Sequence, residues 1–275
     1  MPAGAVVGIV AGGGVVPQYL RQHLKARGQA VRLVALRGEA DIADADATHG
    51  IGDVEGILRT LQDLSVTHAC MIGWVRRRPK LGEARVGWRA LRTALPLLRA
   101  LPKGDDAMLR AAVDAVETAG VRVIGIHELW PELVASGGAA GRVVPSKAER
   151  EGVELGVAAA RELGRFDVGQ GVVVVGRRIV AVEGLEGTDR MIERVATLRA
   201  EGAIRQAGGV LVKVTKPKQE LRTDLPSVGP HTVRAAVDAG LRGVAVEAGR
   251  SLLIERERTI ELADRHGLFV WGIEV

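Results

Sequence analysis

The feature that most constrains the fold is a regular alternation of short apolar runs with stretches of helical periodicity. Apolar runs of five or more residues, flanked by glycine or polar residues, are typical of strands buried on both faces, and helices between them favour a parallel sheet. In the first half we expect strands at 5–10, 31–36, 69–75 and 121–126, and helices at 16–27, 54–64, 88–101 and 105–118.

The second half continues the alternation but includes one antiparallel pair. The runs at 171–175 and 179–182, separated by Gly176-Arg177-Arg178, predict a β-hairpin. The remaining pattern predicts helices at 148–163, 189–200, 232–239 and 258–266, strands at 210–214, 244–247 and 268–273, and a proline-containing loop at 215–230. A small, flexible stretch interrupts the rhythm before residue 147. We therefore predict an α/β protein with a Rossmann-like parallel-sheet domain at 1–135, a linker at 136–146 and a C-terminal α/β domain with a mixed sheet at 147–275.

Composition narrows the class of protein further. The chain is 47% hydrophobic, which excludes disorder, and only 3% aromatic, so its core must consist of aliphatic residues. The net charge of +5 suits an anionic ligand or membrane surface, but no basic run interleaved with aromatics indicates nucleic acid. The lone Cys70, within an apolar run, predicts a buried structural thiol and excludes an internal disulfide. Without a signal peptide or membrane-spanning run, we expect a soluble, cytoplasmic protein.

The glycine turn Gly12-Gly13-Gly14 between the first strand and helix is the first candidate site. Backbone N–H groups of such a turn can approach a phosphate at a helix N-terminus, but a tight turn without a ligand explains the same residues. The turn is no dinucleotide fingerprint, since the third glycine of GxGxxG would fall on Pro17. No GK[ST] follows, so a P-loop is excluded.

Two further candidates lie at predicted helix starts. Lys103-Gly104-Asp105-Asp106 precedes the helix at 105–118, and Glu186-Gly187-Thr188-Asp189 precedes the helix at 189–200. The simpler explanation is helix capping, by Asp105 or Asp106 and by Thr188. The alternative is a lysine contacting phosphate, with acids holding a divalent ion.

The loop after the strand at 210–214 favours a functional role. It contains Lys213, Lys216, Lys218 and Arg222 within ten residues, and a single acid, Asp224, directly before Leu-Pro. Cations and one separate carboxylate suit a polyanionic substrate, and α/β proteins place sites in such loops. The six histidines show no metal-ligand spacing.

Taken together, these segments resemble the LpxI-type UDP-2,3-diacylglucosamine pyrophosphatases of lipid A biosynthesis. One departure is Trp74, which stands where the family pattern has a polar residue. The matching stretches keep their order over almost the whole chain and are Gly8-Ile9-Val10-Ala11-Gly12-Gly13-Gly14, Lys103-Gly104-Asp105-Asp106, Asp167-Val168-Gly169-Gln170-Gly171, Ala181-Val182-Glu183, Glu186-Gly187-Thr188-Asp189, Lys216-Pro217-Lys218-Gln219, Asp224-Leu225-Pro226 and Gly267-Leu268-Phe269.

The resemblance implies a magnesium-dependent hydrolase. It would split UDP-2,3-diacylglucosamine into UMP and 2,3-diacylglucosamine 1-phosphate (lipid X), with Asp224 essential and with the lipid product held by the C-terminal domain. On this hypothesis the catalytic residues are Asp224, Lys213 and Lys216. The expected ligands of Mg²⁺, or of another divalent ion, are Asp224, Asp189 and Glu186. The expected substrate contacts are Gly12, Gly13, Gly14, Lys103, Asp105, Asp106, Glu186, Gly187, Thr188 and Lys218.

Contact with the inner face of the inner membrane is expected from the lipid substrate and the positive charge, and a homodimer is left open. Two other functions compete with this hypothesis. A Rossmann-like oxidoreductase or epimerase acting on a sugar nucleotide would retain a nicotinamide cofactor. A non-catalytic nucleotide-binding regulator would bind an anion without turnover.

Overall fold

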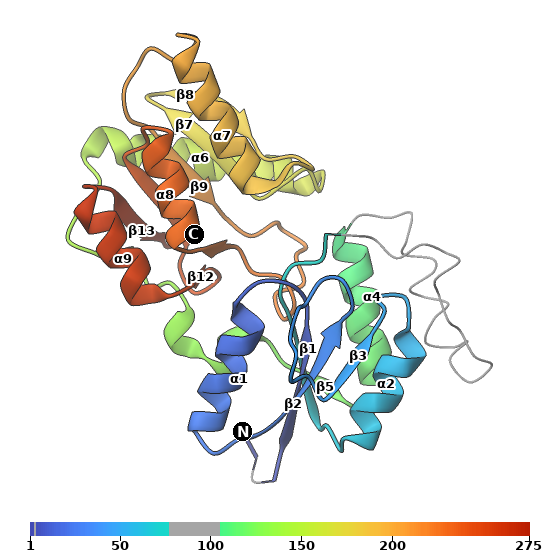
Figure 1. Ribbon diagram of the computed structural model, residues 1–275. Coiled ribbons are helices and arrows are strands. Elements are labelled where there is room, and N and C mark those ends of the chain that lie inside the picture. Colours follow the sequence, from blue (N-terminus) through green and yellow to red (C-terminus); the bar gives the residue numbers. More distant parts are fainter. Residues whose placement is uncertain (3, 77–104) are drawn as a thin grey trace. The chain divides into compact units, whose positions relative to one another are not determined.

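The computed structural model forms two compact units, which are described separately (Figure 1). The structure describes residues 1–2, 4–76 and 105–275. Unit 1 comprises Met1–Pro131 and Glu220–Asp224, and unit 2 comprises Glu132–Gln219 and Leu225–Val275. The helix expected at 88–101 lies outside the described residues.

Unit 1 contains the predicted parallel sheet, with strand order β3-β2-β1-β4-β5. Every neighbouring pair in it is parallel. The strands are β1 (Val6–Ala11), β2 (Ala30–Leu36), β3 (Ala47–His49), β4 (His68–Ile72) and β5 (Arg122–Val123). The central strands are almost wholly buried, because helices cover both faces of the sheet.

Helix α1 covers one face of this sheet, and α2 and α4 cover the other (Figure 1). The helices of unit 1 are α1 (Val16–Ala26), α2 (Val54–Asp63), α4 (Asp105–Thr118) and α5 (Ile126–Leu129). The strand expected at 121–126 is wrong beyond Val123. The Glu128 carboxylate accepts the backbone N–H of Gly125 at 3.1 Å, which starts α5 instead of extending the strand.

Unit 2 contains the predicted mixed sheet, with strand order β6-β13-β11-β9-β7-β8. Its strands are β6 (Gly138–Ala139), β7 (Gly171–Val175), β8 (Arg178–Val182), β9 (Val210–Lys213), β11 (Gly243–Glu247) and β13 (Phe269–Ile273). The predicted hairpin is confirmed as the antiparallel pair β7–β8. Two further short strands, β10 (Ser227–Val228) and β12 (Leu252–Leu253), pair with each other, so the expected loop at 215–230 contains a strand.

Helix α6 packs on one face of the mixed sheet, and α7, α8 and α9 pack on the other. Their bounds are α6 (Lys147–Arg165), α7 (Gly187–Ala200), α8 (Pro230–Asp238) and α9 (Arg256–Arg265), and a short 3-10 helix spans Pro131–Leu133. Both core layers consist almost entirely of aliphatic residues, although Phe269 is buried in the α6 layer and Trp271 packs against that layer.

Two segments differ from the domain boundaries expected from the sequence. Residues 136–146, expected as a linker, belong to unit 2, where Gly138–Ala139 forms β6 and pairs with β13. Glu220–Asp224, expected in the C-terminal domain, groups with unit 1. In the sequence neither stretch shows a helical or strand period, so local pattern gave no indication of these contacts.

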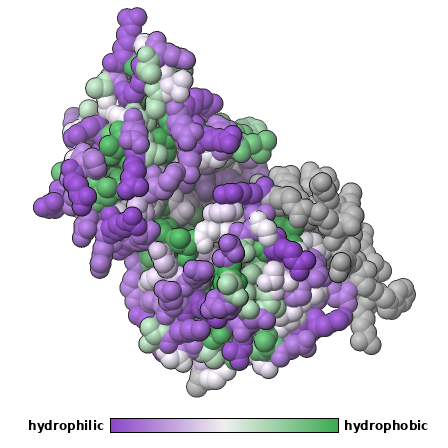
Figure 2. All heavy atoms as spheres, viewed as in Figure 1, coloured by the Kyte–Doolittle hydropathy of each residue, from purple (hydrophilic) through white to green (hydrophobic). Residues whose placement is uncertain are grey.

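Hydrophilic residues dominate the visible surface (Figure 2), and aliphatic residues fill the interior. Figure 2 shows a mainly hydrophilic visible face on which apolar residues form small separate patches. Cys70 is fully buried in β4, and this burial raises the pKa of its thiol to about 12, with a further contribution from the charge of Glu128. The prediction of a structural thiol is therefore confirmed. Within the described parts of the chain, no helix has the length and apolarity needed to cross a membrane.

Candidate active site

Buried polar side chains lie along one edge of the sheet in unit 2. Because β8 and β9 are both antiparallel to β7, and β9, β11 and β13 are mutually parallel, the carboxyl ends of these four strands share that edge. Open α/β sheets bind ligands just outside this edge. We define the polar edge cluster as the buried residues Glu183, Lys213, Thr215, Gln219 and Glu247.

Glu183 follows β8, and both of its carboxylate oxygens accept hydrogen bonds. The Thr188 hydroxyl donates to Oε1 at 2.6 Å, and the backbone N–H of Gln170 donates to Oε2 at 3.3 Å. The carboxylate has room only because residue 171 is glycine, since a Cβ on Gly171 would lie 2.8 Å from Oε2. Glu183 is therefore a satisfied, fixed negative charge.

Glu247, which ends β11, is the second buried carboxylate of the cluster. Its Oε2 accepts both the backbone N–H of Thr215 at 2.9 Å and the Thr215 hydroxyl at 2.6 Å. Its Oε1 accepts from the Arg250 guanidinium at 3.4 Å. Like Glu183, this group has its partners within the chain.

Lys213 differs from these two acids, because its charge is buried and the described part of the chain places no counter-ion beside it. It ends β9 between Gly171 of β7 and Val246 of β11, with 5% of the residue exposed. Its Nζ donates to the backbone carbonyl oxygen of Ser227 at 3.1 Å. Among the described residues no carboxylate lies within 4 Å of it. An ammonium has three donors, so this one can still bind the oxygen of an anionic ligand.

Lys216 and Lys218 occupy different surroundings. The Nζ of Lys216 is 2.5 Å from the Asp167 carboxylate, and its backbone N–H donates to Gln219 at 2.8 Å. Asp167, two residues after the end of α6, adopts a left-handed backbone with φ of 56°. Lys218 is exposed. The side chains of Lys213 and Lys216 are thus held by contacts within unit 2, whereas the side chain of Lys218 is exposed to solvent.

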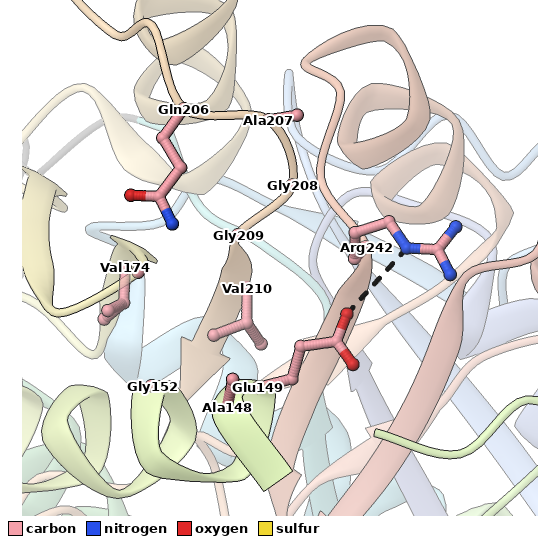
Figure 3. Close-up of a pocket in the computed structure, with 11 residues that line it drawn as sticks. Ala148, Glu149, Gly152, Val174, Gln206, Ala207, Gly208, Gly209, Val210 and Arg242 are labelled. Carbon is pink, nitrogen blue, oxygen red and sulfur yellow. Dashed lines mark ion pairs between the residues drawn. The ribbon is translucent and has the colours of Figure 1, made fainter. Parts of the chain in front are cut away.

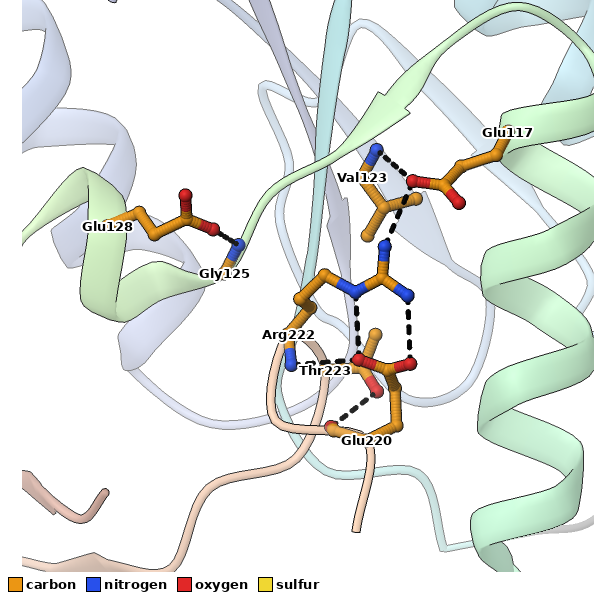
Figure 4. Close-up of polar contacts among 7 residues, drawn as sticks. All are labelled: Glu117, Val123, Gly125, Glu128, Glu220, Arg222 and Thr223. Carbon is orange, nitrogen blue, oxygen red and sulfur yellow. Dashed lines mark hydrogen bonds and ion pairs between the residues drawn. The ribbon is translucent and has the colours of Figure 1, made fainter. Parts of the chain in front are cut away.

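Asp224 is half-buried and belongs to unit 1. Its backbone N–H donates to the carbonyl oxygen of Glu220 at 3.0 Å, which closes the turn that carries it. Figure 4 shows the ion pairs of this turn, in which Arg222 lies between Glu220 and Glu117 of α4. The sequence prediction singled out Asp224, whereas Glu220 and Glu117 were missed.

The glycine turn Gly12–Gly14 is filled by the chain's own residues. The N–H of Gly12 donates to the carbonyl oxygen of Ile72 at 2.9 Å, and that of Gly13 to Trp74 at 2.8 Å. These two amides therefore already donate to carbonyl oxygens of the chain itself, and substrate contact by the glycines of the turn stays a prediction. Their lack of a side chain serves close packing, because a Cβ on Gly13 would lie 2.4 Å from the Trp74 indole.

Trp74 covers this turn and carries a cation on its ring. Its backbone forms an antiparallel bridge with Gly13, and the indole Nε1 lies 3.0 Å from the place of a Cβ on Gly14. The Arg76 guanidinium lies 3.9 Å from the ring centroid. The Trp74 ring thus packs on the glycine turn while 45% of the residue stays exposed.

The start of α7 carries two of the acids expected to bind a divalent ion, and both have partners within unit 2. Thr188 does not cap the helix, because its hydroxyl donates to Glu183, and α7 begins at Gly187 without a side-chain cap. Glu186 pairs with Arg194 at 3.1 Å, and Asp189 lies 3.6 Å from His231. No group of three metal-ligating side chains occurs within 1–2, 4–76 and 105–275. Glu186 and Asp189 thus each have a partner within unit 2, and their role as ligands of a divalent ion stays a prediction.

The candidate at the start of α4 is only partly described. Asp106 is buried in the first turn of this helix. Lys103 and Gly104, and the side chain of Asp105, lie outside the described residues.

A separate open cavity lies at the opposite edge of the unit 2 sheet (Figure 3). It is lined by Glu149 and Gly152 of α6, Gly209 before β9, and Arg242 before β11. Glu149 and Arg242 form an ion pair across it at 3.8 Å. This cavity shares no residue with the polar edge cluster.

Glu183 and Glu247 were not predicted as site residues, although a repeated tetrapeptide in the sequence marks both of them. The same tetrapeptide, Val-Ala-Val-Glu, occurs at 180–183 and at 244–247. In each copy an acid follows an apolar strand directly, so the strand buries the acid at the sheet edge.

Comparison with known families identifies both halves of the chain. The model of the LpxI N-terminal domain matches residues 6–133, and that of the LpxI C-terminal domain matches residues 136–271. The chain belongs to the LpxI family. The curated relative from Caulobacter vibrioides, named UDP-2,3-diacylglucosamine pyrophosphatase LpxI, is 39% identical over 273 residues, which cover 98% of this chain and 97% of that protein. The LpxI resemblance read from the ordered motifs is thereby confirmed.

Two of the solved structures that match this LpxI family member are remote likenesses. The NAD complex of UDP-glucose 4-epimerase from Thermus thermophilus is 13% identical, with a TM-score of 0.31 over 98% of this chain and 86% of that one. The CobK precorrin-6A reductase is 15% identical, with a TM-score of 0.32 over 96% and 98%. At these scores the likenesses carry no argument about function.

Proposed function

We propose that this chain hydrolyses the diphosphate of UDP-2,3-diacylglucosamine, releasing UMP and 2,3-diacylglucosamine 1-phosphate. The observation that carries the proposal is identity of 39% over nearly the full length of a relative named for this activity. Matches to both LpxI domains support it independently of any single motif.

Asp224 is the proposed general base. A diphosphate diester resists hydrolysis because its negative charge repels an attacking oxygen, and a carboxylate that orients or deprotonates water lowers this barrier. A general base contributes about 10²–10⁴-fold to the rate. The half-buried turn of residues 220–224 supports this role because its hydrogen bonds hold the residue in one backbone conformation.

Lys213 is the proposed electrostatic stabiliser of the diphosphate. Its ammonium is buried, has one carbonyl partner, and lies where α/β sheets bind ligands. A fixed donor in such a place stabilises charge that develops in the transition state without reorganising. Lys216, oriented by Asp167, is the proposed second cation, and Lys218 contacts the substrate from the solvent side.

The divalent ion of the proposal, Mg²⁺ or an equivalent, would be held mainly by diphosphate oxygens and water. Magnesium in phosphate chemistry commonly takes only one or two protein carboxylates, and Asp224 is the candidate here. When bound, the ion would neutralise phosphate charge.

The lipid substrate also implies contact with an anionic membrane surface. Two acyl chains favour apolar surroundings by about 0.8 kcal/mol for each buried methylene. The net charge of +5 would attract the chain to such a surface.

The test is direct assay of the purified chain with UDP-2,3-diacylglucosamine, with UMP and lipid X measured by mass spectrometry. We expect both products in equal amounts, and Asp224→Ala to slow their release about 10²–10⁴-fold. A folded Asp224→Ala protein within tenfold of the wild type would remove the base role. No UMP from the wild type would remove the proposed function, and a co-purified nicotinamide cofactor would favour an oxidoreductase.

A further inference from the structure

The five residues Glu220–Asp224 form a turn that is closed on a single carbonyl oxygen. The oxygen of Glu220 accepts the backbone N–H of Thr223 at 3.1 Å and of Asp224 at 3.0 Å, and the Thr223 hydroxyl at 3.3 Å. Although residues on either side belong to unit 2, this turn packs with unit 1.

Arg222 ties the turn to the sheet and helix of unit 1 (Figure 4). Its Nε and one terminal nitrogen bind the two Glu220 carboxylate oxygens, each at 2.9 Å, as a planar fork. Its other terminal nitrogen binds Oε1 of Glu117 at 2.9 Å. That same oxygen accepts the backbone N–H of Val123, at the end of β5, at 3.4 Å.

Glu220 and Arg222 each stabilise the charged form of the other. The hydrogen bonds from Arg222 lower the pKa of Glu220 below its usual range despite partial burial, and Glu220 in turn raises the pKa of Arg222. Both groups are therefore ionised at neutral pH. The planar guanidinium donates from all three of its nitrogens to two carboxylates at once, which a lysine ammonium cannot reproduce.

We propose that Arg222 is a positioning residue for Asp224, holding the turn that carries this carboxylate against Glu117 and β5. The proposal rests on the proposed function, because it takes Asp224 as the base. Asp224 is two residues from Arg222, and its backbone is bonded to Glu220, whose side chain Arg222 clamps. A loosened clamp would therefore displace the carboxylate while leaving the substrate-binding lysines of unit 2 in place.

The test compares Arg222→Lys and Glu117→Gln with Arg59→Lys as the matched control. Arg59 forms an exposed pair with Glu55 on α2 at 3.0 Å, in the same unit but in no proposed role. Because a misplacement of about 1 Å can cost 10²-fold in rate, we expect Arg222→Lys to lower kcat roughly 10–100-fold. Glu117→Gln, which keeps the Glu220 fork, should lower it by about three- to tenfold. KM should stay within about threefold for both variants, and Arg59→Lys should change neither constant.

Hydrogen exchange on peptides covering 217–226 provides a second readout. We expect faster exchange in this segment for Arg222→Lys, with unchanged exchange in the other peptides. An unchanged kcat in a folded Arg222→Lys protein would overturn the positioning role, as would a raised KM with kcat preserved. If the wild type itself released no UMP, the proposed function would fail instead, and full activity of Asp224→Ala would remove the base role on which the positioning role depends. Because these results come from proteins with Arg222 intact, they are distinguishable from a failure at Arg222.

Discussion

Replacing Lys213 by methionine should separate stability from activity. Methionine keeps the length of the side chain but removes the ammonium. Taking a charge out of water costs several kcal/mol when no counter-ion is present, and the Ser227 carbonyl oxygen is the partner of the Lys213 ammonium among residues 1–2, 4–76 and 105–275. Leaving that carbonyl without its donor costs about 1–3 kcal/mol. We therefore expect Lys213→Met to change the free energy of unfolding by about 0 to +2 kcal/mol, towards greater stability.

Activity should change in the opposite direction. Removal of one preorganised donor to the transition state costs about 10²–10³-fold in kcat, or roughly 2.7–4 kcal/mol. The assay is UMP release at saturating substrate, run beside urea unfolding of the same preparation. We expect the Lys213→Met protein to be at least as stable as the wild type but to have a lower kcat, since a buried charge that serves function lowers stability.

Lys25→Met is the control for the chemical change alone. Lys25 is exposed in the last turn of α1. We expect its free energy of unfolding to change by less than about 0.5 kcal/mol and its turnover to stay constant. If Lys213→Met instead unfolded at clearly lower urea and retained its turnover, Lys213 would be a structural cation, and our reasoning on the polar edge cluster would fail.

Three other predictions follow from the structure. Gly13→Ala should destabilise the protein by about 1–3 kcal/mol by overpacking, because the new Cβ would lie 2.4 Å from the Trp74 indole. The loss should be smaller in a Trp74→Ala background. Urea unfolding of the wild type, the two single variants and the double variant measures this, and an equal loss of stability in both backgrounds would contradict it. The Cys70 thiol, with its pKa raised to about 12, should resist iodoacetamide at pH 8 until denaturant is added, whereas labelling of the folded protein would show that β4 opens. Chelation by EDTA should stop UMP release and added Mg²⁺ should restore it, while full activity after exhaustive chelation would remove the ion from the proposal.

Much of the fold could be predicted because long segments show their period clearly. The helix at 105–118 and the hairpin at 171–182 were predicted with nearly the observed bounds. The short strands β3, β6, β10 and β12 were not predicted. With two or three residues each, they are too short for alternation to appear, and pairing with a distant strand defines them.

The site was harder to predict, because its contacts join residues that are distant in sequence. The lysines and Asp224 could be singled out from composition and from the family motifs. Trp74 filling the turn at Gly13 depends on a contact across some sixty residues, and the partner of Thr188 is a buried acid rather than its own helix. Local rules for capping and glycine turns describe neither contact.

The placement of Glu220–Asp224 has a consequence for how the chain is made. On the ribosome, the first 131 residues emerge and can begin to fold before these five residues exist, and N-terminal portions generally fold first. The ion pair between Glu117 and Arg222 can therefore form only after β9 and the residues that follow it have been synthesised. Unit 1 is therefore completed only late in synthesis. If residues before and after 131 were expressed as separate polypeptides, the first would lack Arg222 and the second would lack its partner Glu117.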